Sequence, residues 1–68
     1  MAPIHTRLLS ILSQLQTSPD LRHRGLAGWV EMADDITEEP PNIRITAGTR
    51  QTYYKVTSIE VILGQFGA

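Results

Sequence analysis

The segment that most constrains this chain is residues 42–56, NIRITAGTRQTYYKV, because it specifies a β-hairpin together with its register. β-Branched and aromatic residues dominate the segment, and Gly48-Thr49 interrupts it near the middle. Glycine belongs at the first central position of a type II′ turn, so these two residues are expected to join two antiparallel strands. The resulting register pairs Ala47 with Arg50, Ile45 with Thr52 and Ile43 with Tyr54.

This register gives the hairpin two different faces. The mostly apolar face consists of Ile43, Ile45, Ala47, Thr52, Tyr54 and Val56. The polar face consists of Arg44, Thr46, Gln51, Tyr53 and Lys55. A slip of one residue would bury Arg44 and Lys55, so burial fixes the register. Tyr54 is therefore expected to face the core, and Tyr53 to face solvent opposite Arg44.

The N-terminal segment has the spacing of one amphipathic helix. Its apolar stripe consists of Ile4, Leu8, Ile11, Leu12 and Leu15. Pro3 suits the first helical position, and Thr17-Ser18 followed by Pro19 ends the helix. Leu9 lies on the flank of this stripe. It either widens the core face or belongs to a self-association surface.

The next segment begins with a second helix start and then becomes ambiguous. Ser18-Pro19-Asp20 supplies a capping serine, a proline at the first position and an acid in the first turn. Gly25 and Gly28 each disfavour a continuous helix by ~1 kcal/mol relative to alanine. We therefore favour a short helical turn followed by a strand over residues 28–32, with a continuous helix as the alternative.

Trp29 has two interpretations that depend on this choice. In the strand version it points away from Val30 and Met32, where an exposed tryptophan would be a good interface anchor. In the other interpretation it is a core tryptophan.

Residues 33–41, ADDITEEPP, are interpreted as a solvated loop because of their acids and the two adjacent prolines. The segment after Val56 is open to two interpretations, since its apolar residues change phase at Thr57-Ser58. We favour a β-bulge followed by more strand. The alternative is a helix with a Thr57/Glu60 capping box, whose apolar positions are Ile59, Ile62, Leu63 and Phe66.

The fold expected from these segments is a single α+β domain over residues 1–68. An N-terminal amphipathic helix packs on a small antiparallel sheet of about three strands, centred on the hairpin at residues 42–56. A chain of this length buries a thin core that supplies about 3–5 kcal/mol. There is no cysteine, so neither a disulfide framework nor a cysteine zinc site can add stability.

Charge and hydropathy narrow the class of protein. The formal net charge is −1, and the acids concentrate in residues 31–39, between two mildly basic segments. Such a balance lacks the strong positive field typical of non-specific nucleic-acid binding. No apolar run approaches the ~20 residues of a membrane-spanning helix. We expect a soluble, cytoplasmic protein without a membrane partner.

No residue pattern indicates catalysis, a metal site or a bound cofactor. His5 and His23 are far apart in the sequence, and the serines lack the context of an activated nucleophile. Zinc sites need three or four ligands, which these two histidines do not supply. We therefore expect a non-enzymatic protein.

The leading hypothesis is a protein-binding or assembly module, self-associating into a homo-oligomer, that uses a sheet edge together with Leu9 or Trp29. An exposed edge invites strand addition from another chain. The first alternative is a nucleic-acid-binding module, since a tyrosine among cations can stack bases and neutralise phosphates. Its candidate residues are Arg22, Arg24, Arg44, Tyr53 and Lys55.

A second alternative is a phage or mobile-element accessory or structural protein. The size and the order of helix, hairpin and terminal apolar segment are similar to those of several small phage-encoded structural and inhibitor proteins. This resemblance covers size and element order, and no motif carries it.

Overall fold

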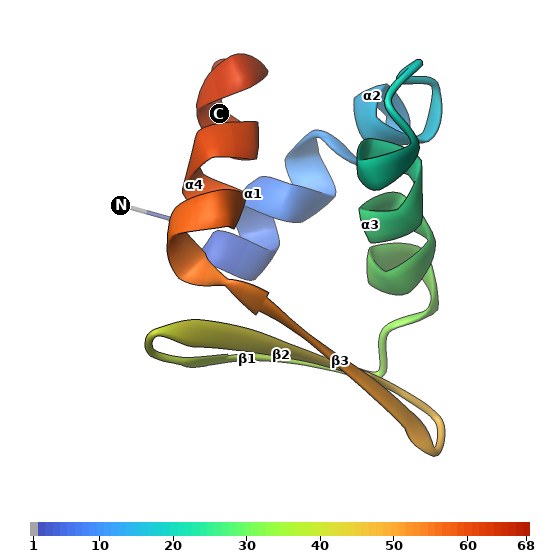
Figure 1. Cartoon of the computed structure of the whole chain (residues 1–68), viewed down its shortest axis with the longest axis vertical. Helices are drawn as coiled ribbons and strands as arrows, with labels where there is room; N and C mark the ends of the chain where they lie inside the picture. The colour runs from blue at the N-terminus through green and yellow to red at the C-terminus, as the bar shows by residue number, and fades with distance from the viewer. Residues whose placement is uncertain (1) are drawn as a thin grey trace.

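The computed structural model describes residues 2–68, which form two layers, with the helices on one side of a three-stranded antiparallel sheet (Figure 1). The elements are α1 (Ile4–Ser10), α2 (Leu12–Gln16), α3 (Leu21–Met32), β1 (Asp35–Glu39), β2 (Asn42–Ala47), β3 (Arg50–Lys55) and α4 (Val56–Gln65). The strands form a meander in the order β1-β2-β3. The predicted α+β class is confirmed.

The hairpin of β2 and β3 has the predicted register. Ala47 pairs with Arg50, Ile45 with Thr52 and Ile43 with Tyr54. Gly48 has φ +62° and Thr49 has no positive φ, as a type II′ turn requires. Tyr54 is half-buried on the helix side of the sheet, and Tyr53 is 55% exposed on the other side.

The interpretation of residues 33–41 as a loop is wrong, because β1 lies within them. Ile36 pairs with Ile45, and Thr37 pairs with Arg44. The strand forms because β2 has a second unpaired edge, and Ile36 can bury part of its side chain on the helix side. The two prolines lie in the β1–β2 turn, where the Pro40–Pro41 peptide is cis.

The predicted N-terminal helix is present but interrupted. α1 ends at Ser10, and Ile11 has non-helical angles of φ −112° and ψ 10° before α2 begins. The Ser10 hydroxyl donates to the Arg7 carbonyl at 2.6 Å, and such back-bonding bends helices. The stripe is otherwise as predicted, with Leu8 and Leu15 fully buried.

The favoured strand over residues 28–32 is wrong, because α3 continues as a helix to Met32. Leu26 and Val30 bury one face of α3 against the core, which outweighs the low helix propensity of the two glycines. The helix start predicted near Ser18-Pro19-Asp20 is confirmed, but the predicted capping residue is wrong. Asp20, not Ser18, is the N-cap residue, and its carboxylate accepts from the Arg22 N–H at 2.9 Å.

The favoured strand after Thr57-Ser58 is also wrong, because β3 leads directly into α4. Ile59 and Leu63 are fully buried in the core, as the helical alternative required. No capping box starts α4: its N-cap is Lys55, and no side chain caps it. The Val56 N–H donates instead to the Pro41 carbonyl at 2.9 Å, so the β1–β2 turn fixes the start of α4.

The core lies between the helix layer and one face of the sheet. It draws on all four helices and on β2, the central strand. Its buried hydrophobic residues are Ile4, Leu8, Ile11, Leu15, Leu26, Ala27, Val30, Ile43, Ile45, Ile59 and Leu63. The opposite face of the sheet is therefore left to solvent (Figure 1).

Candidate interaction surface

The face of the sheet that points away from the helices is here called the open face. No helix or strand of residues 2–68 covers it (Figure 1). Side chains alternate along each strand, so the pairing register determines its members. They are Asp35, Thr37 and Glu39 from β1, Asn42, Arg44 and Thr46 from β2, and Gln51, Tyr53 and Lys55 from β3.

The open face has mixed charge. Arg44 pairs with Tyr53 across the strands, as the sequence predicted. However, Nη1 of Arg44 also lies 3.1 Å from Oε1 of Glu39, so a carboxylate of β1 neutralises the central cation. Lys55 is exposed at the β3 side of the face. The arrangement is that of a polar surface with one exposed aromatic ring, acidic on one side and basic on the other.

Two of the predicted nucleic-acid residues lie elsewhere, on the helix layer. Arg22 of α3 pairs with Asp20, with 3.0 Å between Nη2 and Oδ2. This hydrogen-bonded guanidinium lowers the pKa of Asp20 to about 2. Nη1 of Arg24 donates to the Ser18 carbonyl at 3.3 Å. The structure therefore brings together Arg44, Tyr53 and Lys55 but separates them from these two arginines.

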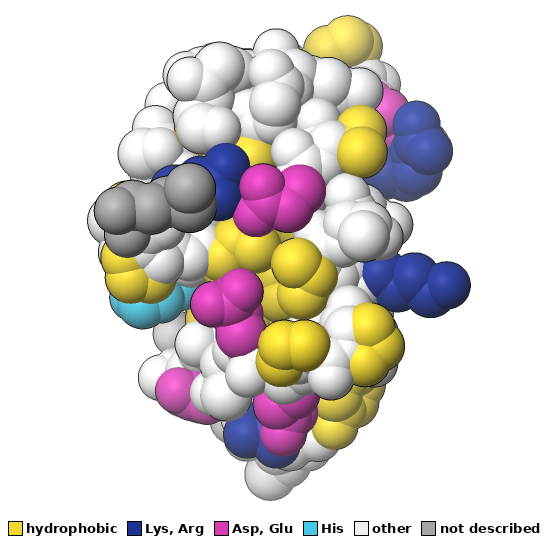
Figure 2. Space-filling view, turned by 90° about the vertical axis from the view of Figure 1, so that its left-hand side faces the viewer, with side chains coloured by type: hydrophobic (Ala, Val, Ile, Leu, Met, Phe, Trp, Pro, Cys, Tyr) yellow, Lys and Arg dark blue, Asp and Glu magenta, His cyan; other side chains and the backbone are white. Residues whose placement is uncertain are grey.

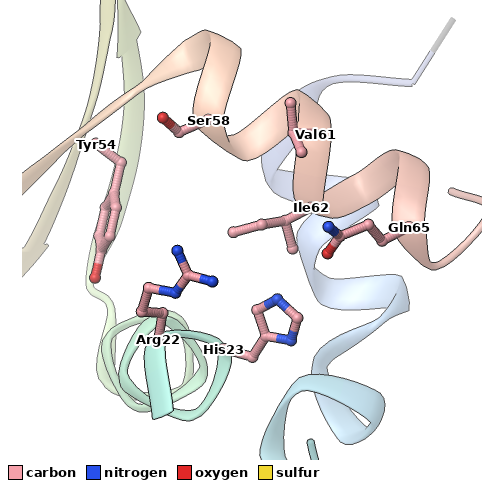
Figure 3. A pocket seen from close by; sticks show the side chains of 7 residues that line it. All are labelled: Arg22, His23, Tyr54, Ser58, Val61, Ile62 and Gln65. Atoms are coloured by element: carbon pink, nitrogen blue, oxygen red, sulfur yellow. The ribbon is translucent and has the colours of Figure 1, made fainter. Parts of the chain in front are cut away.

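A groove of about 370 Å³ lies between α3, β3 and α4 and is here called the α3–α4 groove (Figure 3). It is lined by Arg22, His23, Tyr54, Ser58, Val61, Ile62 and Gln65. Ile62 points into the groove, with the ring of Tyr54 and the guanidinium of Arg22 across from it (Figure 3). Burial raises the pKa of the Tyr54 phenol.

His23, which lines the α3–α4 groove, is fixed in place by contacts with Ser18 and Phe66. Its Nδ1 lies 2.8 Å from the Ser18 hydroxyl, and its ring packs edge-on against Phe66 with centroids 5.4 Å apart. The Ser18 hydroxyl also accepts from the Asp20 N–H at 3.2 Å, and Ser18 is itself buried. His23 thus links the start of α3 to the end of α4. No sequence pattern predicts this link, because His23 and Phe66 are distant in the chain.

A second groove, of about 330 Å³, lies between α1 and the start of β1 and is here called the α1–β1 groove. It is lined by His5, Leu9, Val30, Ala33, Asp34, Asp35 and Ile36. Leu9 is 54% exposed in it, which is too much for a residue that widens the core. The face of the molecule on the side of the N-terminus shows hydrophobic side chains gathered among acidic ones (Figure 2).

Trp29 is not a free surface anchor. It lies on α3, is half-buried and packs against the core. The guanidinium of Arg50 lies 5.5 Å from the centroid of its ring, within cation–π range. The expectation that Trp29 points away from the core depended on a strand at residues 28–32, and it fails with that strand.

Asp34 has a structural role that the sequence did not indicate. One of its carboxylate oxygens accepts from the Gly48 N–H at 2.6 Å, and its own N–H donates to the Thr46 carbonyl at 2.8 Å. Asp34 therefore ties the end of α3 to the β2–β3 turn. Asp34 lies in a run of acidic residues, and no sequence pattern distinguishes it from its neighbours.

No family model, curated protein or solved structure matches this chain. Within residues 2–68 no helix is long and apolar enough to cross a membrane. The same residues contain no cluster of three or more histidine, aspartate or glutamate side chains that could hold a metal ion.

Proposed function

We propose that this protein is a small non-enzymatic module for protein binding and self-association that works through its sheet. The observation that carries this proposal is the one-sided packing of the fold. All the helices lie against one face, so the other face and the outer edges of β1 and β3 remain without a partner in residues 2–68. Unpaired strand edges are templates for strand addition.

The distribution of exposed hydrophobic side chains supports a protein partner. Leu9 is 54% exposed in the α1–β1 groove, and Tyr53 is 55% exposed at the middle of β3. Tyrosine is enriched at protein interfaces, since it supplies a large contact area with a polar tip. With only a thin core, a chain of this size also gains stability from association.

Nucleic-acid binding is the second candidate, favoured by the pairing of Arg44 with Tyr53 on the open face. The same face carries Asp35 and Glu39, and Glu39 is in contact with Arg44. Carboxylates at this position repel phosphates and reduce the number of counterions that a polyanion would release. The mixed charge therefore favours a protein surface as the partner.

Sedimentation velocity at several protein concentrations tests the proposal. The weight-average mass should rise with concentration and fall again on dilution. Leu9→Ser should weaken the association if the α1–β1 groove contributes to it. Leu21→Ser is the matched control, because Leu21 is 74% exposed at the start of α3 and outside that groove. A strict monomer at all concentrations would contradict the self-association.

A further inference from the structure

The two outer edges of the sheet carry opposite charge. β1 contributes Asp35, Glu38 and Glu39 and contains no cation. β3 contributes Arg50 and Lys55 and contains no acid. The β1 edge of one molecule therefore repels the β1 edge of another and attracts its β3 edge.

The opposite charges also lie at matching levels of the sheet. Glu39 pairs with Asn42, and Asn42 pairs with Lys55, so Glu39 and Lys55 lie at the same level on opposite edges. Both side chains belong to the open face by strand alternation. A copy displaced sideways in the plane of the sheet would therefore bring Lys55 of one molecule beside Glu39 of the next.

A second matched pair lies at the other end of the strands. Arg50 pairs with Ala47, one level beyond the pairing of Asp35 with Thr46. Asp34 precedes Asp35 and reaches the turn at Gly48, so it lies at the end of the sheet where Arg50 lies. The same sideways displacement brings Arg50 of one molecule near Asp34 of the next.

We propose that a second copy of this chain extends the sheet head to tail, with the β3 edge of one molecule beside the β1 edge of the next. This inference rests on the proposed self-association and specifies its geometry. β1 and β3 run in the same direction in the meander, so the new strand pair is parallel. A two-fold dimer would instead place β1 against β1 or β3 against β3, which sets like charges side by side.

The geometry predicts the form of the assembly. A head-to-tail interface leaves one acidic edge and one basic edge free at the ends, so growth continues until a ring closes or a filament forms. Charges on edge strands protect against pairing when the facing edge has the same sign. In this protein the edge charges permit the pairing of β3 with β1 and disfavour the symmetric pairings of β1 with β1 and of β3 with β3.

Matched charge reversals test this proposal. Glu39→Lys and Lys55→Glu change the charge at the same level of the sheet on opposite edges. Glu31→Lys is the control, because it is also a glutamate-to-lysine substitution but lies on α3 and outside the sheet. Each edge variant alone should associate at least about tenfold more weakly than the wild type, because like charges then face each other. An equimolar mixture of the two should recover the wild-type mass in sedimentation velocity.

The outcomes separate this inference from the proposed function. If the wild type associates and both edge variants associate equally well, the head-to-tail geometry is wrong and the proposed function stands. If one edge variant loses association and the mixture does not recover it, a symmetric edge pairing replaces this geometry. A wild type that stays monomeric overturns both. Circular dichroism checks the fold of each variant, and Glu39→Gln with Lys55→Gln replaces any variant that unfolds.

Discussion

Arg7 on α1 and Glu60 on α4 join the first and last helices of the chain through an ion pair with 2.9 Å between Nη1 and Oε1. Nη2 of Arg7 also donates to the Ala68 carbonyl at 3.1 Å. The sequence pattern favours a capping box between Glu60 and Thr57 in the helical alternative for this segment. The structure uses Glu60 instead for this contact between residues that are distant in the sequence.

Glu60→Gln is expected to lower the free energy of unfolding by ~0.5–1 kcal/mol, because the pair is partly exposed and ion pairs of this kind are weak. The effect should shrink at about 0.5 M salt, where exposed charges are screened. Urea unfolding of the wild type, Glu60→Gln, Arg7→Gln and the double variant measures the coupling. Strictly additive effects would show that the pair contributes nothing.

Gly25→Ala is expected to stabilise the protein by ~0.5–1 kcal/mol, since alanine is the better residue inside a helix. Gly25 lies within α3, and a Cβ at this position meets no atom within 4 Å. Thermal unfolding followed by circular dichroism measures the change. A lower midpoint temperature for Gly25→Ala would contradict this expectation and show that helix propensity does not dominate at this position.

Gly48→Ala is the matched control for this substitution. It also has open space around its Cβ, but its φ of +62° is strained for any residue with a side chain. We expect Gly48→Ala to destabilise the protein by ~1 kcal/mol or more. The same chemical change should therefore have opposite signs in α3 and in the β2–β3 turn.

Asp20→Asn is expected to reduce the dependence of stability on acidic pH. The pKa of Asp20 is lowered from 3.8 to about 2 by its hydrogen bonds with Arg22. The ionised carboxylate therefore stabilises the folded state fully above its ordinary pKa, and this contribution is lost as the pH falls through about 2.

Asparagine is the informative replacement because it can still cap α3 but cannot carry the charge. Unfolding midpoints at several pH values between about 2 and 6 give the measurement. The midpoints of wild type and variant should differ at the upper end of this range and converge at the lower end. A constant difference would contradict a role for the charge.

The open face is expected to bind single-stranded oligonucleotides weakly or not at all. Carboxylates of Asp35 and Glu39 share it with Arg44 and Lys55, so its net charge is near zero. Fluorescence anisotropy of a labelled oligonucleotide at ~50 mM salt measures binding. A salt-dependent signal that disappears in the double variant Arg44→Gln, Lys55→Gln would instead support the nucleic-acid alternative.

Two elements could be predicted from local sequence because one pattern dominated each of them. In the hairpin, the Gly48-Thr49 turn and the strand alternation agree on a single register, and a slip would bury Arg44 or Lys55. In the N-terminal segment, the apolar stripe from Ile4 to Leu15 matches only a helix. The apolar stripe does not predict the interruption at Ile11, next to which the Ser10 hydroxyl donates to the Arg7 carbonyl.

The candidate site could be predicted only in part. The pairing of Arg44 with Tyr53 followed from periodicity, whereas the position of Leu9 on the flank of the stripe left open whether it is exposed. The α3–α4 groove could not be predicted in this way, because His23, Tyr54 and Ile62 come from three elements whose contact depends on packing.

Long-range packing sets the conformation of the segments whose local signals conflict or are weak. Residues 28–32 and 58–66 carry glycines or β-branched residues that oppose a helix, yet burial of Val30, Ile59 and Leu63 makes each segment helical. β1 exists because β2 offers an edge and a partner for Ile36. Local sequence thus determined the hairpin and the first apolar stripe. The remaining elements depended on long-range burial, whose partners are distant in the chain and which selects among the alternatives that local patterns leave open.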